Sequence, residues 1–237
     1  MSTSDSEKYI LSALLDADSF FYALLDAQSL ITYDTGKSNL SDIKYLIEEK
    51  PIQPLLSKVA TWTDQMTIIP KDDYDASHIE AYLRTDKPNL SLSYQADFLQ
   101  DSNAYLCYAV PTFHLQRLSD DISVSKVNHL ITALYSSLST AYSRSILLHR
   151  HEKITLLLAI NEGRMMAFST VHEASPVSLL YNVSLVTEKH NVMKDTIIIL
   201  SGDFHKEGQT KKLISKYFPI EVLGPSFYLE SIYRCVL

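Results

Sequence analysis

Three apolar runs separated by two short polar breaks open the folded part of the chain, in YILSALLDADSFFYALLDAQSLITYD at residues 9–34. The first two runs, 9–15 and 19–26, predict two strands joined by a tight turn. The second run is apolar almost throughout, which is typical of a central strand covered on both faces. Residues 29–34 predict a third strand, and Gly36 is expected to end it.

The same pattern returns in the second half of the chain, at residues 144–170. When the two stretches are aligned, Leu11–Leu15 falls on Ile146–Arg150, and Phe20–Asp26 falls on Thr155–Asn161. The polar breaks coincide as well, although few residues are identical. This spacing predicts an internal duplication of one folding unit.

After each set of three strands, apolar strands alternate with helical patterns. A helix is expected to start at Ser175-Pro176, because proline suits the first position of a helix. The alternation predicts an α/β protein with mixed sheets covered by helices. Further strands are expected at 59–63, 66–70, 90–99, 104–111, 196–200 and 220–224, and further helices at 112–118, 130–141 and from 210.

The composition is that of a globular protein, with 46% hydrophobic and 21% charged residues among 237. The net charge of −7 argues against a nucleic-acid partner, because duplex binding needs a positive face. No run of about 18 uncharged apolar residues predicts a transmembrane segment, and the start MSTSDSEKY has no basic leader. We therefore expect a cytoplasmic protein, with Cys107 and Cys235 as buried thiols.

Glycine is scarce, with five residues in the chain. Loops that wrap phosphate closely need clustered glycines, since a Cβ atom blocks the approach of the backbone. No two glycines here are close enough in the sequence to form such a loop. The chain therefore lacks an intact phosphate-binding loop of the usual kind.

Four segments, taken in order, resemble an uncharacterised bacterial family, a domain of unknown function with the actin-like ATPase fold. They are MTIIPKDDYDASHIEAYLR (66–84), AYLCYAVP (104–111), the hairpins of 144–170 and IIILSGDFHKEGQTKKLISKYF (197–218). The resemblance implies two ribonuclease H-like lobes, at residues 1–143 with an inserted β element near 88–111 and at residues 144–237.

Active members of that superfamily hold nucleotide phosphate on the amides of two hairpins, the first of which reads roughly Asp-x-Gly. A third turn, of small residues, lies against the adenosine. Here the first hairpin contains Asp16, Asp18 and Ser19 but no glycine, and the second, HRHE at 149–152, has neither glycine nor aspartate. The third turn keeps one glycine, in Ser201, Gly202 and Asp203. The resemblance thus implies a degenerate phosphate site at these six positions.

The acidic residues of the first hairpin allow two interpretations. Asp16 or Asp18 could reach Mg²⁺ through coordinating water, which would let an acid lie near phosphate. Alternatively, aspartate is a common residue of tight turns and has no ligand there. The turn chemistry favours the second interpretation.

Two other polar clusters also have a structural explanation. His149, His151 and Glu152 could bind a metal, but Arg150 and a lysine beside them favour a polar turn instead. Ser201, Asp203 and His205 lie too close together in the sequence for a hydrolase triad, and no Gly-x-Ser-x-Gly motif surrounds the serine. We expect a loop at the carboxyl end of a strand, where α/β proteins bind ligands.

These observations lead to three functional hypotheses. The first is a pseudo-enzyme, a non-catalytic actin-like module without a cofactor that acts through an unknown protein partner. The second is a switch or weak ATPase that binds Mg-ATP at Asp16 or Asp18. The third is a nuclease of the ribonuclease H type, which would need several carboxylates converging on two metal ions. The eroded phosphate elements favour the first.

Overall fold

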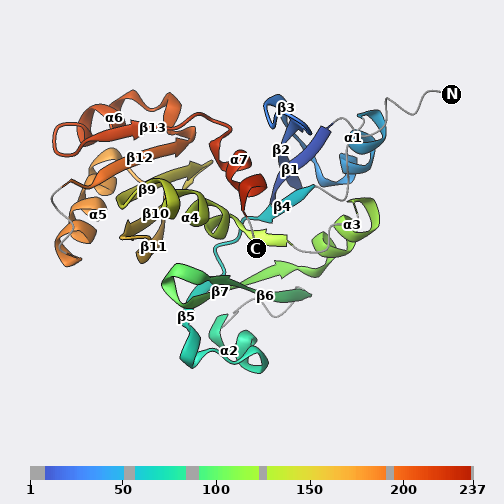
Figure 1. Ribbon diagram of the computed structural model, residues 1–237, viewed down its shortest axis with the longest axis horizontal. Coiled ribbons are helices and arrows are strands. Elements are labelled where there is room, and N and C mark those ends of the chain that lie inside the picture. Colours follow the sequence, from blue (N-terminus) through green and yellow to red (C-terminus); the bar gives the residue numbers. More distant parts are fainter. Residues whose placement is uncertain (1–8, 51–56, 84–90, 123–126, 191–194, 236–237) are drawn as a thin grey trace. The chain divides into compact units, whose positions relative to one another are not determined.

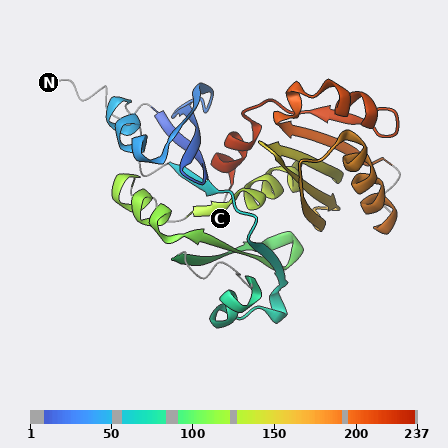
Figure 2. The same ribbon diagram turned by 180° about the vertical axis from the view of Figure 1, so that it is seen from behind.

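The computed structural model describes residues 9–50, 57–83, 91–122, 127–190 and 195–235. The chain forms two compact units (Figures 1 and 2). Unit 1 consists of Met1–Ala133 together with Leu229–Leu237, and unit 2 is Leu134–Tyr228. The helix α4 (Leu130–Ala141) therefore begins in unit 1 and ends in unit 2.

Unit 1 is built on a five-stranded mixed sheet with the order β3-β2-β1-β4-β8. The first three strands form an antiparallel meander, whereas β4 is parallel to β1 and β8 is parallel to β4. The strands are β1 (Tyr9–Asp16), β2 (Ser19–Asp26), β3 (Thr32–Asn39), β4 (Lys58–Thr61) and β8 (Val127–His129).

One face of this sheet is covered by α1 (Ile43–Glu49) and α3 (Thr112–Ile122). Alternate residues of β1 point to these helices, and Ile43 and Leu118 complete a core of fully or almost fully buried side chains. On the opposite face the Ser12 hydroxyl donates a hydrogen bond of 2.5 Å to the carbonyl of Leu229. That carbonyl belongs to α7 (Phe227–Arg234), so both faces of β1 are covered.

A second, three-stranded antiparallel sheet in unit 1 has the order β5-β7-β6. Its strands are β5 (Met66–Pro70), β6 (Leu92–Leu99) and β7 (Ala104–Pro111), and the short helix α2 (Ile79–Leu83) contacts all three (Figure 2). The strands β6 and β7 fall within the segment near 88–111 for which an inserted β element is expected, and residues 88–90 of that segment lie outside the described part of the chain. That this segment is an insertion in the lobe stays a prediction.

A buried carboxylate joins this small sheet to its surroundings. Asp97, on β6, is fully buried and accepts hydrogen bonds from the backbone amide of His129 (2.9 Å) and the hydroxyl of Thr132 (2.8 Å). The hydroxyl of Tyr108 shares its proton between Asp97 (3.1 Å) and the carbonyl of Val127 (2.8 Å). These hydrogen bonds compensate the cost of burying the charge.

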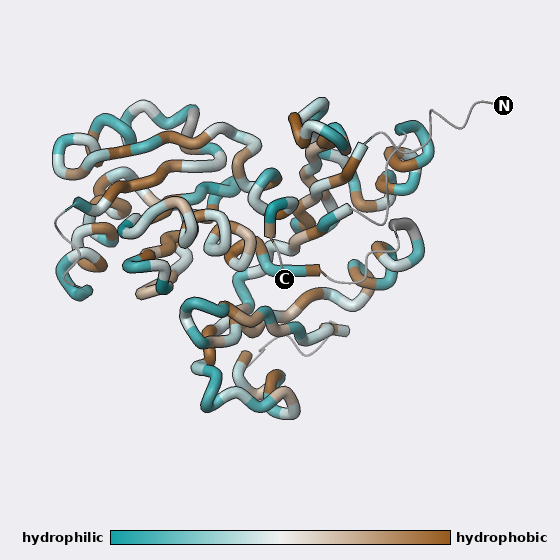
Figure 3. Tube along the Cα trace, viewed as in Figure 1, coloured by the Kyte–Doolittle hydropathy of each residue, from teal (hydrophilic) through white to brown (hydrophobic). Residues whose placement is uncertain are grey.

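Unit 2 repeats the architecture of the first sheet, with the order β11-β10-β9-β12-β13. Its core lies between the sheet and two helices, α5 (Pro176–Lys189) and α6 (Gly208–Ile214). Leu179, Val183 and Ile214 of these helices are fully buried there. Figure 3 shows hydrophobic residues concentrated along the strands of the unit 2 sheet. The elements are β9 (Arg144–His151), β10 (Ile154–Asn161), β11 (Arg164–His172), α5 (Pro176–Lys189), β12 (Ile197–Gly202), α6 (Gly208–Ile214) and β13 (Ile220–Val222).

The predicted α/β fold with a duplicated unit is confirmed. The strands β9 and β10 match β1 and β2 in length, and the turn that joins each pair is equally short. Both five-stranded sheets have the same strand order and directions. The helix expected after Ser175 is also present, and the Ser175 hydroxyl accepts a hydrogen bond from the amide of Ser178 as an N-cap.

The prediction for the third strand was wrong in its bounds. β3 covers Thr32–Asn39, so Gly36 lies inside the strand and does not end it. The preceding turn is held by Asp26, whose carboxylate accepts from the amides of Gln28 and Ser29. Gly36 has a packing role, because a Cβ atom there would lie 2.6 Å from the hydroxyl oxygen of Tyr22 on the neighbouring strand.

Among the helices in the described part of the chain, none is both long and apolar enough to span a lipid bilayer. Cys107 and Cys235 are both buried, and neither forms a disulfide within the described part of the chain. Burial raises the pKa of Cys107 to about 11, so this thiol is protonated at neutral pH.

Candidate functional site

The first hairpin of unit 1 is a two-residue turn between β1 and β2, closed by the pair Asp16 and Ser19. Ala17 has a left-handed backbone with φ of 46°, although it is not glycine. The Ser19 hydroxyl donates to the Asp16 carbonyl (3.1 Å), and the Leu40 amide donates to the Asp18 carbonyl (2.9 Å). The backbone of the turn is therefore fixed within the unit.

The Asp18 side chain is exposed at the tip of this turn. Its carboxylate makes no hydrogen bond or ion pair with any residue that the structure describes. The turn thus presents one uncompensated negative charge to solvent.

Helix α3 brings a histidine to the same turn. His114 is 3% exposed, and neither ring nitrogen makes a hydrogen bond of normal geometry with a described residue. Burial lowers the pKa of His114, and the nearby carboxylate of Asp18, the carbonyl of Ala17 and the carboxylate of Asp16 oppose this shift only in part. The ring is therefore neutral near pH 7 and does not compensate the charge of Asp18.

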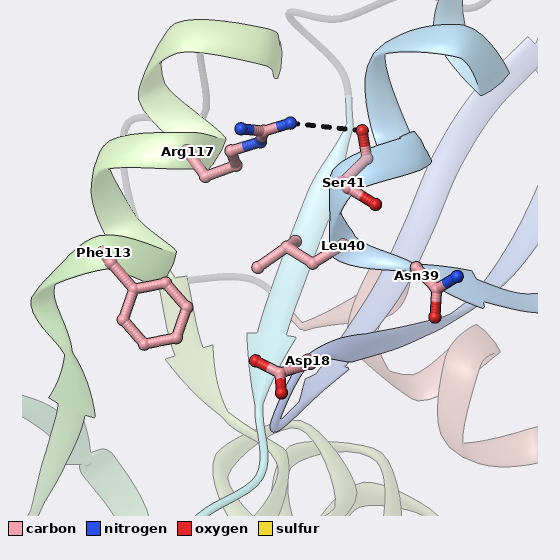
Figure 4. Close-up of a pocket in the computed structure, with 6 residues that line it drawn as sticks. All are labelled: Asp18, Asn39, Leu40, Ser41, Phe113 and Arg117. Carbon is pink, nitrogen blue, oxygen red and sulfur yellow. Dashed lines mark hydrogen bonds between the residues drawn. The ribbon is translucent and has the colours of Figure 1, made fainter.

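A pocket of about 350 Å³ lies beside the Asp18 turn, within unit 1 (Figure 4). Leu40 and Phe113 point toward its centre, with Asp18 at one end and Arg117 at the other. The Arg117 guanidinium donates a hydrogen bond of 3.2 Å to the carbonyl of Ser41. The residues that line the pocket are Asp18, Asn39, Leu40, Ser41, Phe113 and Arg117.

The corresponding hairpin of unit 2 turns at Glu152 and Lys153, between β9 and β10. Glu152 has φ of 52° and is the first residue of its turn, as Ala17 is in the first hairpin. Its backbone amide donates a hydrogen bond of 3.1 Å to the carboxylate of Asp203. The backbone N–H of Glu152 is therefore already hydrogen-bonded to a carboxylate of the same unit.

The end of β12 is packed against β9 around Gly202. This glycine has φ of 69°, and a Cβ atom there would lie 2.1 Å from the carbonyl oxygen of Arg150. The Ser201 hydroxyl, fully buried, lies 2.8 Å from Nδ1 of His149. Burial lowers the pKa of His149 to about 3, and the nearby His151 adds to this shift. Ser201 and His149 thus form a neutral, buried pair without access to a substrate.

A partly buried ion pair lies next to this strand end. The Arg150 guanidinium bonds to the Glu207 carboxylate, the hydroxyl of Thr155 (3.0 Å) and the carbonyl of Ala174 (3.0 Å). It also stacks on the ring of Phe204, 4.6 Å from the ring centre. The polar groups around the second hairpin are therefore largely satisfied by their own unit.

The six residues predicted for a degenerate phosphate site fall into two groups. Asp16, Asp18 and Ser19 form one turn of unit 1, whereas Ser201, Gly202 and Asp203 end β12 in unit 2. Their role in nucleotide binding stays a prediction. Within the described residues no group of three histidine, cysteine or acidic side chains is arranged to hold a metal ion.

Sequence reasoning missed the contribution of α3 to the first hairpin. Phe113, His114 and Arg117 follow β7 and lie far from Asp18 along the chain. One signal was present in the sequence, because Phe113 and Arg117 lie one helical turn apart on the face opposite the apolar Leu115 and Leu118.

The model of a family described as a protein of unknown function (DUF3822) matches residues 1–220. No curated protein matches this sequence. The similar solved structures share little sequence with this chain, and they show its fold alone.

A protein of Bacteroides thetaiotaomicron, described as having the actin-like ATPase fold and unknown function, is similar with a TM-score of 0.77. The two share 12% identity over 98% of this chain and 97% of that one. A PilM–PilN type IV pilus biogenesis complex gives a TM-score of 0.59, with 10% identity over 92% of this chain and 89% of that one. An inorganic polyphosphate/ATP-glucomannokinase of Arthrobacter sp. strain KM gives 0.53, with 9% identity over 96% and 98%.

Proposed function

We propose that this chain, which belongs to the DUF3822 family of proteins of unknown function, is a non-catalytic actin-like module that works through contact with another protein in the cytoplasm. The module keeps the duplicated fold and uses neither ATP nor Mg²⁺. Its partner is a protein and not a nucleic acid.

The hydrogen bond between Asp203 and Glu152 carries this proposal. Backbone amides at such turns can hold phosphate because they are donors without a partner inside the protein. Here the amide of Glu152 already donates to a carboxylate, 3.1 Å away. A nucleotide phosphate would have to displace that carboxylate and would meet a like charge beside it. The second hairpin therefore does not fit a nucleotide phosphate.

The comparison with the pilus complex supports a role in protein contacts. That structure, described as a complex of PilM and PilN, is similar to this chain with a TM-score of 0.59. The actin-like fold therefore occurs in a two-protein complex. We carry over the kind of function, contact with another protein, and not the identity of the partner.

One observation favours the alternative, a switch that binds Mg-ATP. The Asp18 carboxylate is exposed and has no partner among the described residues, so it could bind a water molecule of a magnesium ion. The first hairpin alone would then have to hold the nucleotide.

Thermal melting with Mg-ATP separates the two functions. A ligand that binds the native state raises the melting temperature by mass action. We expect no shift at millimolar Mg-ATP beyond that of Mg²⁺ with sulfate at equal ionic strength. A shift that disappears in Asp18→Ala and persists in Asp101→Ala, an exposed acid on the loop between β6 and β7, would overturn the proposal and establish the switch.

A further inference from the structure

We propose that the pocket of unit 1 binds an extended segment of a partner protein in which one apolar side chain is flanked by a basic residue on one side and an acidic residue on the other. This inference rests on the proposed function and specifies its docking surface. The basic residue pairs with Asp18, the apolar side chain packs between Leu40 and Phe113, and the acidic residue pairs with Arg117.

The centre of the pocket supplies the apolar contact. Phe113 is 50% exposed, although phenylalanine is usually buried, and its ring faces the pocket together with the side chain of Leu40 (Figure 4). Leu40 itself is only 5% exposed and is fixed in the core of unit 1. A mobile apolar side chain from a partner would thus meet one rigid wall and one aromatic ring, an arrangement that provides binding energy at protein interfaces.

The Asp18 end selects a cation. Its carboxylate is exposed and has no hydrogen bond or ion pair with a described residue, and the buried ring of His114 behind it is neutral near pH 7. A lysine or arginine side chain could reach this carboxylate while its methylene groups lie against Phe113.

The Arg117 end selects an anion. A hydrogen bond to the carbonyl of Ser41 fixes the position of the guanidinium at the pocket wall. A guanidinium has five N–H donors in a planar fork, so Arg117 can bind more than one acceptor at the same time, a carboxylate included. A polyanion such as ATP suits the pocket less well. Its phosphates could pair with Arg117, but it has no cationic group to pair with Asp18 at the opposite end.

The test uses the full chain, labelled with nitrogen-15, and four synthetic octapeptides. Two carry the sequences Gly-Ser-Lys-Leu-Ala-Glu-Ser-Gly and Gly-Ser-Glu-Ala-Leu-Lys-Ser-Gly, which present the three groups in either chain direction. The third has serine in place of leucine in the better binder. The fourth has glutamate in place of its lysine. Binding is followed by the shifts of backbone amide signals.

We expect at least one of the first two peptides to shift the amide signals of Leu40, Phe113 and Arg117, with a dissociation constant of about 1 mM or tighter. The serine peptide should bind more than about tenfold more weakly, because it lacks a buried leucine. Asp18→Asn should weaken the better binder roughly twofold to fivefold, as for an exposed ion pair. The matched control Asp101→Asn should leave its affinity unchanged.

Charge reversal gives the decisive result. The Asp18→Lys variant should no longer bind the better of the first two peptides. It should instead bind the peptide in which glutamate replaces lysine. The proposal is overturned if neither of the first two peptides shifts these amides at millimolar concentration, or if Asp18→Lys leaves the preference unchanged. Failure of the proposed function has a different signature, the Mg-ATP shift in melting temperature, which none of the peptide measurements can produce.

Discussion

The backbone amide of Glu152 donates a hydrogen bond to the carboxylate of Asp203, and this bond ties the turn of the second hairpin to the end of β12. Asp203→Ala should cost about 1 kcal/mol of unfolding free energy, because it removes one exposed hydrogen bond and a weak ion pair with Lys206. It should also speed hydrogen exchange at the amide of Glu152. Asp203→Asn keeps a carbonyl oxygen as acceptor and should protect that amide better than alanine does. Equal exchange in all three proteins would contradict the hydrogen bond.

Substitution of Gly202 should be among the most destabilising changes in unit 2. In Gly202→Ala the new Cβ atom would lie 2.1 Å from a backbone carbonyl oxygen, and φ would have to stay at 69°. We expect a loss of more than about 2 kcal/mol in urea unfolding. Gly208→Ala is the matched control, because its added Cβ would meet no atom within 4 Å apart from its chain neighbours and its own helix backbone. A loss in the control as large as that in Gly202→Ala would show that the close contact is not the cause.

Removal of the Asp97 carboxylate should destabilise unit 1. Asp97→Ala would leave the amide of His129 and the hydroxyl of Thr132 as buried donors without a partner. The expected loss is about 3 kcal/mol, measured by urea unfolding, since buried unsatisfied donors pay their full desolvation cost. Asp101→Ala, at an exposed aspartate of the loop that follows β6, should change the unfolding free energy by less than about 0.5 kcal/mol. If the two variants are equally stable, the network does not stabilise the unit.

Acid should weaken the fold through His149. Its pKa is lowered from 6.5 to about 3 in the folded state, so below pH 6.5 the unfolded chain binds a proton that the folded chain does not. The contribution of the neutral His149 ring to the unfolding free energy is complete above pH 6.5. It is lost at ~1.4 kcal/mol per pH unit as the pH falls from 6.5 toward 3.

His149→Asn should therefore flatten the dependence of unfolding free energy on pH between about 6 and 4, whatever its effect at neutral pH. The measurement is urea unfolding at several pH values in that range. His172→Asn replaces an exposed histidine of the same unit and should leave the slope unchanged. An unaltered slope in His149→Asn would contradict a neutral buried imidazole.

Glycine should fit the turn of the first hairpin better than the native residue. Ala17 has φ of 46°, a conformation that costs a non-glycine residue about 1 kcal/mol. Ala17→Gly should therefore raise the unfolding free energy, or at least not lower it. Ala81→Gly replaces an exposed alanine of α2 and should lower it by about 0.5–1 kcal/mol. A loss at position 17 as large as that at position 81 would contradict the strain.

Local pattern was enough to predict the duplicated strands and the start of α5. Ser175 followed by Pro176 is a short-range signal, and the apolar runs of β1 and β9 are long enough to define central strands. The bounds of β3 could not be predicted in this way. β3 is an exposed edge strand, so its residues carry no continuous apolar signal, and Gly36 is explained by a side chain on the neighbouring strand.

The candidate site was predictable only at its acidic end. Asp18 is marked by the hairpin in which it lies, but α3 reaches that hairpin through tertiary packing. The bond between Glu152 and Asp203 also joins residues that are 51 apart. Periodicity reports which face of an element is buried, and it carries no information on which distant side chain completes a site.

Ala17 and Glu152 occupy equivalent positions in the two halves, and both have a left-handed backbone without being glycine. The first residue of each turn therefore shares the same backbone φ region, although its side chain is an alanine in one turn and a glutamate in the other. A search for related hairpins that demands glycine at this position would miss both copies in this chain. Matching the backbone dihedral angles of the turn would detect them, and could reveal further members of the fold whose sequences no longer show it.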